Sequence, residues 1–186
     1  EVRARLEAAI RAVGRVEVPD HPSYPYAGTA FLVGPGLMMT NRHVAQIFAN
    51  GLGRRDVTFI PGLSAEVDFK RELQSPATIR VRVVKVEAIH PYWDCALLRV
   101  EGIDPARAPL SLEAVEPDRV ADREVVVIGY PAQDHRSSDF AMMMRIFSGV
   151  FNVKRLQPGL LRGYQSIRSF GNEVNAITHD ASTLGG

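Results

Sequence analysis

Short apolar segments separated by turn residues run through most of this chain, and they limit its fold more than any other feature of the sequence. Their lengths and their β-branched residues predict strands, and stretches such as Gly34-Pro35-Gly36 mark the turns between them. The predicted strands cover residues 28–33, 37–40, 57–60, 66–73, 79–89, 95–100, 124–130, 142–154, 160–168 and 173–178. Because few helices separate these strands, the pattern favours a sandwich or barrel over a parallel α/β sheet. The predicted fold class is all-β.

The segments between the strands suggest how the chain is divided. Apolar residues recur at helical spacing in residues 1–14, which predicts an amphipathic helix on the outside of the domain. The proline-rich segment 15–26 predicts a loop, and the segment 103–121 predicts a linker that crosses the surface. We therefore expect a helix with its lead-in loop over residues 1–26, a first β domain over 27–104, a linker over 105–121 and a second β domain over 122–186.

Composition excludes several classes of partner. The chain has 22 basic and 21 acidic residues, a net charge of +1, and no segment gathers Lys and Arg alone, so nucleic-acid binding is not expected. No apolar run reaches about 18 residues, and no signal-peptide pattern is present, so no membrane contact is expected. The single cysteine, Cys95, cannot form an internal disulfide, which favours a cytoplasmic location. Because the chain begins at Glu1 rather than Met, we expect further residues upstream.

One histidine lies where a predicted strand gives way to a short predicted helix over residues 44–48. It is His43, in the stretch Thr40-Asn41-Arg42-His43-Val44-Ala45. A histidine ring exchanges protons near neutral pH, so a rigid position suits it to general-base chemistry. Asp94 follows 51 residues later, just before an apolar strand, where a carboxylate can orient the ring and fix its tautomer. Each residue also has a structural interpretation, because strand ends often carry structural histidines and Asp is an ordinary turn residue.

Four motifs, in order along the chain, resemble the signatures of a known family. They are Gly28-Thr29-Ala30-Phe31-Leu32-Val33, Met39-Thr40-Asn41-Arg42-His43-Val44, Asp94-Cys95-Ala96-Leu97-Leu98 and Val127-Ile128-Gly129-Tyr130-Pro131. Together they are similar to the trypsin-like (chymotrypsin-fold) serine peptidases, most closely to their bacterial, disulfide-free branch. The resemblance implies two six-stranded antiparallel β-barrels with an active site in the cleft between them. It also implies peptide-bond hydrolysis, with His43 as general base and Asp94 as its orienting carboxylate.

The same resemblance predicts that the attacking serine is not among these 186 residues. In the family, a segment such as Thr178-His179-Asp180-Ala181-Ser182-Thr183-Leu184-Gly185-Gly186 is followed by Asn or Asp, then by the nucleophilic serine and a glycine. This register places the serine about two positions beyond Gly186 and gives Gly186 one backbone N–H of the oxyanion hole. We therefore expect an incomplete second barrel and, for the chain as written, no turnover.

Other side chains are weaker candidates. Ser182 lacks the following glycine that exposes a nucleophilic serine, so it suits a pocket-lining role, where an uncharged residue argues against a strict Arg or Lys preference. His179, near the expected active-site end, is a candidate for substrate contact. Cys95 could form a Cys–His pair with His43, but the preferred interpretation is a small buried hydrophobe. No His or Cys spacing typical of zinc occurs, so neither a metal nor another cofactor is expected.

Two classes of function remain open from the sequence. The first is a serine endopeptidase acting on a peptide or protein substrate, with an attached sensor or effector domain as a possible regulator. The second is a catalytically silent module of the same fold that binds peptides or gates a neighbouring domain. The residues encoded just after Gly186 separate the two, because serine favours the peptidase and Gly or Ala favours the silent module.

Overall fold

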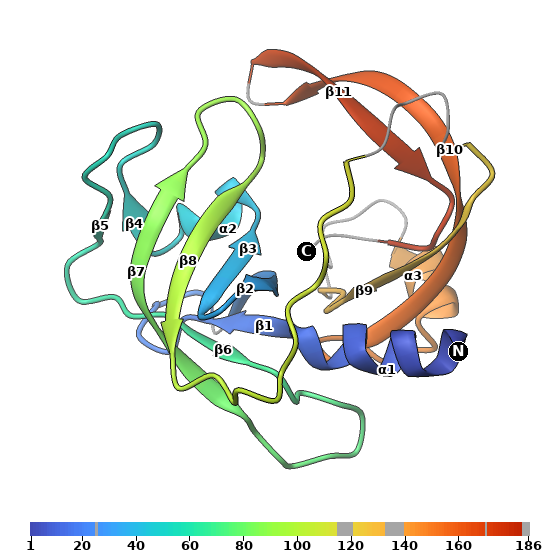
Figure 1. Ribbon diagram of the computed structural model, residues 1–186, viewed down its shortest axis with the longest axis horizontal. Helices are drawn as coiled ribbons and strands as arrows, with labels where there is room; N and C mark the ends of the chain where they lie inside the picture. Colours follow the sequence, from blue (N-terminus) through green and yellow to red (C-terminus); the bar gives the residue numbers. More distant parts are fainter. Residues whose placement is uncertain (25, 115–120, 133–139, 170, 184–186) are drawn as a thin grey trace.

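Six antiparallel strands close into a barrel in the first half of the chain (Figure 1). The computed structural model describes residues 1–24, 26–114, 121–132, 140–169 and 171–183. The order around the ring is β1 (Val13–Glu17), β2 (Tyr26–Gly34), β3 (Leu37–Thr40), β8 (Ala96–Glu101), β7 (Arg80–Ile89) and β6 (Glu66–Asp68). β1 closes the ring by pairing with both β2 and β6, so each strand has two neighbours.

Apolar side chains from all six strands fill the barrel. The buried strand residues are Val16, Ala30, Leu32, Met38, Val67, Val81, Val83, Val86, Ile89, Ala96, Leu98 and Val100. In β7 the register shifts between Val83 and Lys85 and again between Val86 and Ala88. Such β-bulges insert a residue and change which residue faces inward. This explains why the alternation of residues 79–89 is imperfect in the sequence while the segment is still one strand.

The first strand of the barrel lies where the sequence predicts the end of the helix, at residues 13–14, and the start of a loop. All five residues of β1 are buried, so the loop prediction for residues 15–26 is wrong for residues 15–17, and Tyr26 begins β2. Charged side chains are rarely buried unless they are paired. The charged residues Arg15 and Glu17 therefore made this segment look like an exposed loop in the sequence. Arg15 Nε donates to Glu17 Oε1 at 2.8 Å, which makes their burial possible. Residues 18–24 form the expected connection.

A helix precedes the barrel and a single helical turn follows β3. α1 (Val2–Ala12) confirms the expected N-terminal helix, and Lys154 Nζ donates to the carbonyl oxygen of Ile10 near its C-terminal end at 2.9 Å. α2 (Arg42–Ala45) begins two residues earlier than predicted. After it, β4 (Ala49–Asn50) and β5 (Thr58–Phe59) form a small two-stranded sheet. Within the described ranges, no helix has the length and apolar character needed to cross a membrane.

The second half of the chain builds a three-stranded antiparallel sheet. It contains β9 (Glu124–Gly129), β10 (Arg155–Ser169) and β11 (Asn172–His179), with β10 in the middle. β10 is the long curved strand in orange in Figure 1, and it pairs with β9 through residues 155–160 and with β11 through residues 161–169. The curve is eased by a register shift between Leu161 and Gly163, where Gly163 has a φ of +94°.

Two predictions for this half of the chain are wrong. Residues 142–154 do not form a strand, because α3 (Phe140–Ile146) covers their beginning. Met143 of this helix is buried together with Phe147 and Phe151, which follow its end. Pro158-Gly159 is not a turn but part of β10. A Cβ on Gly159 would lie 2.5 Å from the backbone nitrogen of Ala181, so glycine permits this close approach of two chain segments.

The fold class predicted from the sequence is confirmed, since the described chain is mostly β, with a closed barrel, further sheets and an N-terminal helix. Residues 102–114 contain no helix or strand, as expected of a linker, and residues 115–120 and 133–139 lie outside the described part. The division into domains at residues 27–104, 105–121 and 122–186 stays a prediction, although the barrel takes β1 from the segment ahead of residue 27.

Candidate active site

The two side chains predicted to form a catalytic pair lie next to each other. β3 ends at Thr40, Asn41 stands at the N-cap position of α2, and His43 belongs to that helix. Asp94 lies in the loop between β7 and β8, and its Oδ2 is 2.8 Å from His43 Nδ1. The backbone N–H of His43 donates to Asp94 Oδ1 at 3.0 Å, so both carboxylate oxygens bind the same residue. The edge of the barrel therefore fixes the ring in two ways, through its backbone and through Nδ1.

The hydrogen bond to Asp94 sets the tautomer of His43. An ionised carboxylate can only accept, so Nδ1 carries the proton and Nε2 keeps its lone pair. The imidazole side chain is 44% exposed, which leaves the ring open to a reacting partner. A neutral imidazole held in this way can take a proton through Nε2 and return it later.

Asn41 supports the carboxylate from the other side. Its Nδ2 lies 3.2 Å from Asp94 Oδ2 and 3.3 Å from the backbone oxygen of Asp94. Partial burial raises the pKa of Asp94, but the backbone N–H of His43, its ring and the Asn41 amide outweigh burial and lower the pKa below its usual value. Asp94 is thus held ionised beside the ring. The sequence analysis did not single out Asn41, and the only signal was its place in the His43 motif.

Arg42 is a second residue that the sequence analysis missed. Its side chain is almost completely buried, and Nη1 donates to the backbone oxygen of Pro91 at 2.6 Å. Arg42 therefore ties α2 to the loop that carries Asp94. A contact between residues 49 positions apart leaves no local pattern in the sequence, so this role becomes visible only in the fold.

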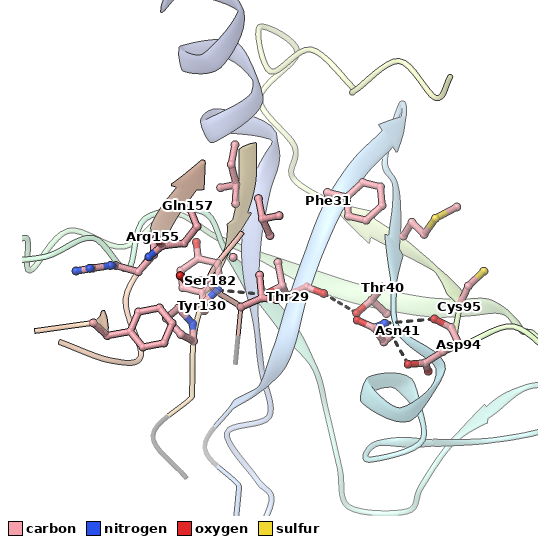
Figure 2. Close-up of a pocket in the computed structure, with 17 residues that line it drawn as sticks. Thr29, Phe31, Thr40, Asn41, Asp94, Cys95, Tyr130, Arg155, Gln157 and Ser182 are labelled. Atoms are coloured by element: carbon pink, nitrogen blue, oxygen red, sulfur yellow. Dashed lines mark hydrogen bonds between the residues drawn. The ribbon is translucent and has the colours of Figure 1, made fainter. Parts of the chain in front are cut away.

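A cavity of about 510 Å³ lies between the barrel and the second sheet. Figure 2 shows Asp94 and Asn41 at one side of it and Ser182, Tyr130 and Gln157 at the other, with Thr29 of β2 between them. The cavity reaches Asp94 but not His43. Strand residues from both halves of the chain line it, which makes this cavity the point where the two halves face each other.

The weaker candidates from the sequence have different positions relative to the His43–Asp94 pair. Ser182 is partly buried at the far side of the cavity, and His179 is exposed at the end of β11, opposite Leu161. Cys95 is half-buried at the cavity wall, where burial and the neighbouring Asp94 raise the pKa of its thiol and so disfavour a thiolate nucleophile. Gly186, predicted for the oxyanion hole, lies outside the described residues. In the described part of the chain, no cluster of His, Cys, Asp and Glu could hold a metal ion.

A closed barrel joined to a second antiparallel sheet, with a His–Asp pair at the barrel edge, defines a chymotrypsin-like protein. Residues 28–186 match the trypsin-like peptidase domain family, and the chain therefore belongs to that family. A probable serine protease of Lysobacter enzymogenes is 31% identical over 205 residues, which cover 98% of this chain and 52% of the relative. This chain thus spans about half the length of that relative.

Solved structures show the same fold. The Rv3671c protease of M. tuberculosis, in its active form, aligns with a TM-score of 0.53 at 19% identity, covering 96% of this chain and 63% of that one. Its inactive form aligns with a TM-score of 0.51 at 19% identity, covering 96% of this chain and 70% of that one. At this level of identity the likeness concerns the fold alone.

Proposed function

We propose that this protein is a serine endopeptidase that hydrolyses peptide bonds through an acyl-enzyme. The observation that carries the proposal is the pair of hydrogen bonds between Asp94 and His43. One joins Asp94 to the ring at 2.8 Å, and the other joins it to the backbone N–H at 3.0 Å. Membership of the trypsin-like peptidase domain family supports the same reaction class. His43 acts as the general base and Asp94 as the carboxylate that orients it.

The proposed reaction follows from the lone pair on His43 Nε2. This nitrogen takes the proton of a serine hydroxyl as its oxygen attacks the substrate carbonyl, and Asp94 stabilises the imidazolium that forms. Backbone N–H groups bind the oxyanion of the tetrahedral intermediate. The imidazolium then protonates the leaving amine as the C–N bond breaks. In a second round, the same ring takes a proton from water as the water oxygen attacks the acyl carbonyl, and it returns that proton to the serine oxygen as the acyl C–O bond breaks.

The serine and the oxyanion hole rest on the family register alone. By that register we expect the serine about two positions after Gly186, and we propose that Gly186 supplies one of the oxyanion-hole N–H groups. By the same register we propose Ser182 for the pocket that binds the residue before the cleaved bond, and its position on the cavity wall supports this role. His179 stays a candidate for substrate contact. An attached sensor or effector domain and a cytoplasmic location are likewise proposals.

Substitution of His43 tests the proposal in the full-length protein. We expect His43→Ala to lower kcat/KM for hydrolysis of a fluorogenic peptide library by at least about 10³-fold, since the base is lost. His21→Ala is the matched control, because His21 lies in the loop between β1 and β2. The His21→Ala variant should be as active as the wild type. Full activity in the His43→Ala variant would overturn the assignment.

A covalent probe tests the nucleophile separately. A fluorophosphonate should label one serine of the full-length protein, and peptide mapping should place the label after Gly186 rather than on Ser182. Ser182→Ala should leave labelling intact. A label on Ser182 would contradict the proposed register, whereas neither labelling nor hydrolysis in the wild type would favour a silent peptide-binding module.

A further inference from the structure

We propose that His90 is a positioning residue, whose unprotonated Nδ1 holds the turn that presents Asp94 to His43. The role deepens the proposed peptidase function and rests on it, because the turn matters for catalysis only if Asp94 orients a base. Among the described residues, no hydrogen bond joins the side chain of His90 to Asp94 or to the ring of His43. His90 would act through the backbone between them.

The turn is closed by hydrogen bonds that begin at His90. Its Nδ1 accepts from the backbone N–H of Trp93 at 2.8 Å and from that of Tyr92 at 3.1 Å. Its own N–H donates to the backbone oxygen of Cys95 at 2.9 Å, and the N–H of Cys95 donates to Trp93. Bonds from one residue therefore reach both sides of Asp94, which fixes the position of its Cα.

This arrangement requires one tautomer of His90. A nitrogen that accepts two N–H groups must carry a lone pair, so the proton of neutral His90 lies on Nε2. His43 needs the opposite form, because its Nδ1 donates to Asp94. His43 and His90 are thus assigned opposite tautomers, and each assignment follows from the partners of Nδ1. Protonation of His90 on Nδ1 would place a donor against two donors and open the turn.

Contacts from α2 hold the turn in place from outside. Arg42 Nη1 donates to the backbone oxygen of Pro91, and Asn41 Nδ2 donates to that of Asp94. These bonds locate the turn relative to His43 but do not fix its internal shape. The internal bonds of His90 do so. Loss of the Nδ1 acceptor should therefore shift the carboxylate without detaching the loop.

The chain contains a second turn closed by a histidine, which serves as a matched control for the His90 turn. His21 also precedes a proline, and its Nδ1 accepts from the N–H groups of Ser23 at 3.1 Å and Tyr24 at 3.0 Å. The turn it closes lies between β1 and β2 and carries no residue of the site. Replacing His21 removes the same two hydrogen bonds from a similar turn, so it reproduces the local cost of the substitution without affecting Asp94.

Three substitutions at His90 separate the acceptor from the ring. His90→Ala and His90→Phe both remove the acceptor, and His90→Phe retains a ring. His90→Asn keeps an acceptor, because Oδ1 of Asn forms the same bonds to the next N–H groups in an Asx turn. In the full-length protein we expect His90→Ala and His90→Phe to lower kcat by about tenfold to a hundredfold with little change in KM, as for a misplaced catalytic group. His90→Asn and His21→Ala should stay within about threefold of wild type.

Long-range ¹H–¹⁵N NMR, which reports which ring nitrogen of each histidine carries the proton, gives a readout independent of peptidase activity. In the wild type, His43 should be protonated on Nδ1 and His90 on Nε2. His43 should shift toward the Nε2–H form in His90→Ala and His90→Phe, and should stay unchanged in His90→Asn and His21→Ala. Trp93, the one tryptophan of the sequence, lies in the turn, so its fluorescence shows whether the turn has opened in a folded variant.

The two readouts distinguish failure of this inference from failure of the proposed function. Suppose that the wild type hydrolyses no peptide, that its His43 is protonated on Nδ1 and its His90 on Nε2, and that His43 changes tautomer in His90→Phe. This result overturns the peptidase assignment and supports the positioning role. Wild-type kcat and an unchanged His43 tautomer in His90→Phe overturn the positioning role and leave the peptidase standing. A wild-type His90 protonated on Nδ1 also overturns it. If His90→Ala does not fold, the comparison of His90→Phe with His90→Asn decides the question.

Discussion

The barrel and the second sheet are built in different ways. The barrel closes on itself around a continuous core of twenty buried apolar residues, whereas the described part of the second half has a buried cluster of only Met143, Phe147 and Phe151. No residue of β10 or β11 is fully buried, and several large apolar side chains on them are exposed: Leu156, Tyr164, Ile167 and Ile177. Burial of apolar surface is the main stabilising term in folding, so the barrel should be the more stable unit.

This difference bears directly on the candidate site. His43 and Asp94 both belong to the barrel, so the geometry of the pair is set by the stable half of the chain. The second sheet supplies the opposite wall of the cavity, with Tyr130 and Ser182. The candidate site thus combines a His–Asp pair held by the more stable half with a cavity wall supplied by the less stable half.

Among the described residues, the buried apolar clusters of the two halves are separate, and polar contacts join the halves. Arg15 of β1 donates to the backbone oxygen of Asn152 at 2.8 Å, and Tyr26 donates to the side-chain oxygen of the same residue. Lys154 Nζ donates to the backbone oxygens of Ile10 and Phe69 at 2.9 and 2.6 Å. Buried polar groups of this kind are costly to leave unpaired, so they specify how the halves dock.

The largest loss of stability should follow when a buried side chain of the barrel is truncated. Leu98 of β8 is completely buried, and Leu98→Ala should lower the free energy of unfolding by about 3 kcal/mol, from lost transfer energy and an unfilled cavity. Ile177→Ala is the matched change in β11, where the side chain is 42% exposed, and should cost less than about 1 kcal/mol. Urea unfolding at equilibrium measures both. Equal losses at the two sites would contradict the comparison between a self-contained barrel and a loosely packed sheet.

A smaller effect is expected where the halves meet. The Glu17 side chain is 6% exposed and binds Arg15 at 2.8 Å and Arg71 at 3.1 Å. Glu17→Gln keeps the shape but removes the charge between two guanidinium groups, and should cost about 2 kcal/mol of unfolding free energy.

An exposed pair provides the control for this charge removal. Glu101 and Arg82 are 63% and 74% exposed, so Glu101→Gln should change stability by less than about 0.5 kcal/mol. If the Glu17→Gln variant is as stable as the wild type, the buried network does not hold β1 in place.

The same contrast explains what the sequence could predict. The barrel strands from residue 28 to residue 100 alternate well enough to be recognised, except where the bulges of β7 change the buried face. β1 was not predicted as a strand because its charged residues Arg15 and Glu17 are buried as a pair. α3 was not predicted as a helix because three consecutive methionines show no helical periodicity. His43 and Asp94 carry motifs of their own. Asn41, Arg42 and His90 have roles that depend on backbone groups of the Asp94 loop, which the sequence does not place.

The smallest effect concerns Lys154, whose pKa reports on the joint between the halves. Burial lowers its pKa from 10.5 to about 8, against the opposing charge of Glu72. The folded protein therefore releases this proton near pH 8, while the unfolded chain keeps it to about pH 10.5. Where the unfolded state binds more protons, stability rises with pH. Relative to Lys154→Met, the wild type should thus gain about 1 kcal/mol between about pH 7.5 and about pH 9.

Urea unfolding of both proteins at the two pH values measures this gain, because all other titrating groups cancel in the difference. Lys154→Gln keeps N–H donors for the carbonyl oxygens of Ile10 and Phe69 but cannot titrate, so it should lose the pH dependence while retaining part of the contact. A pH-independent difference between wild type and Lys154→Met would mean that Lys154 keeps its proton throughout. The two carbonyl acceptors would then outweigh burial, and the joint would be a charged contact at neutral and mildly alkaline pH alike.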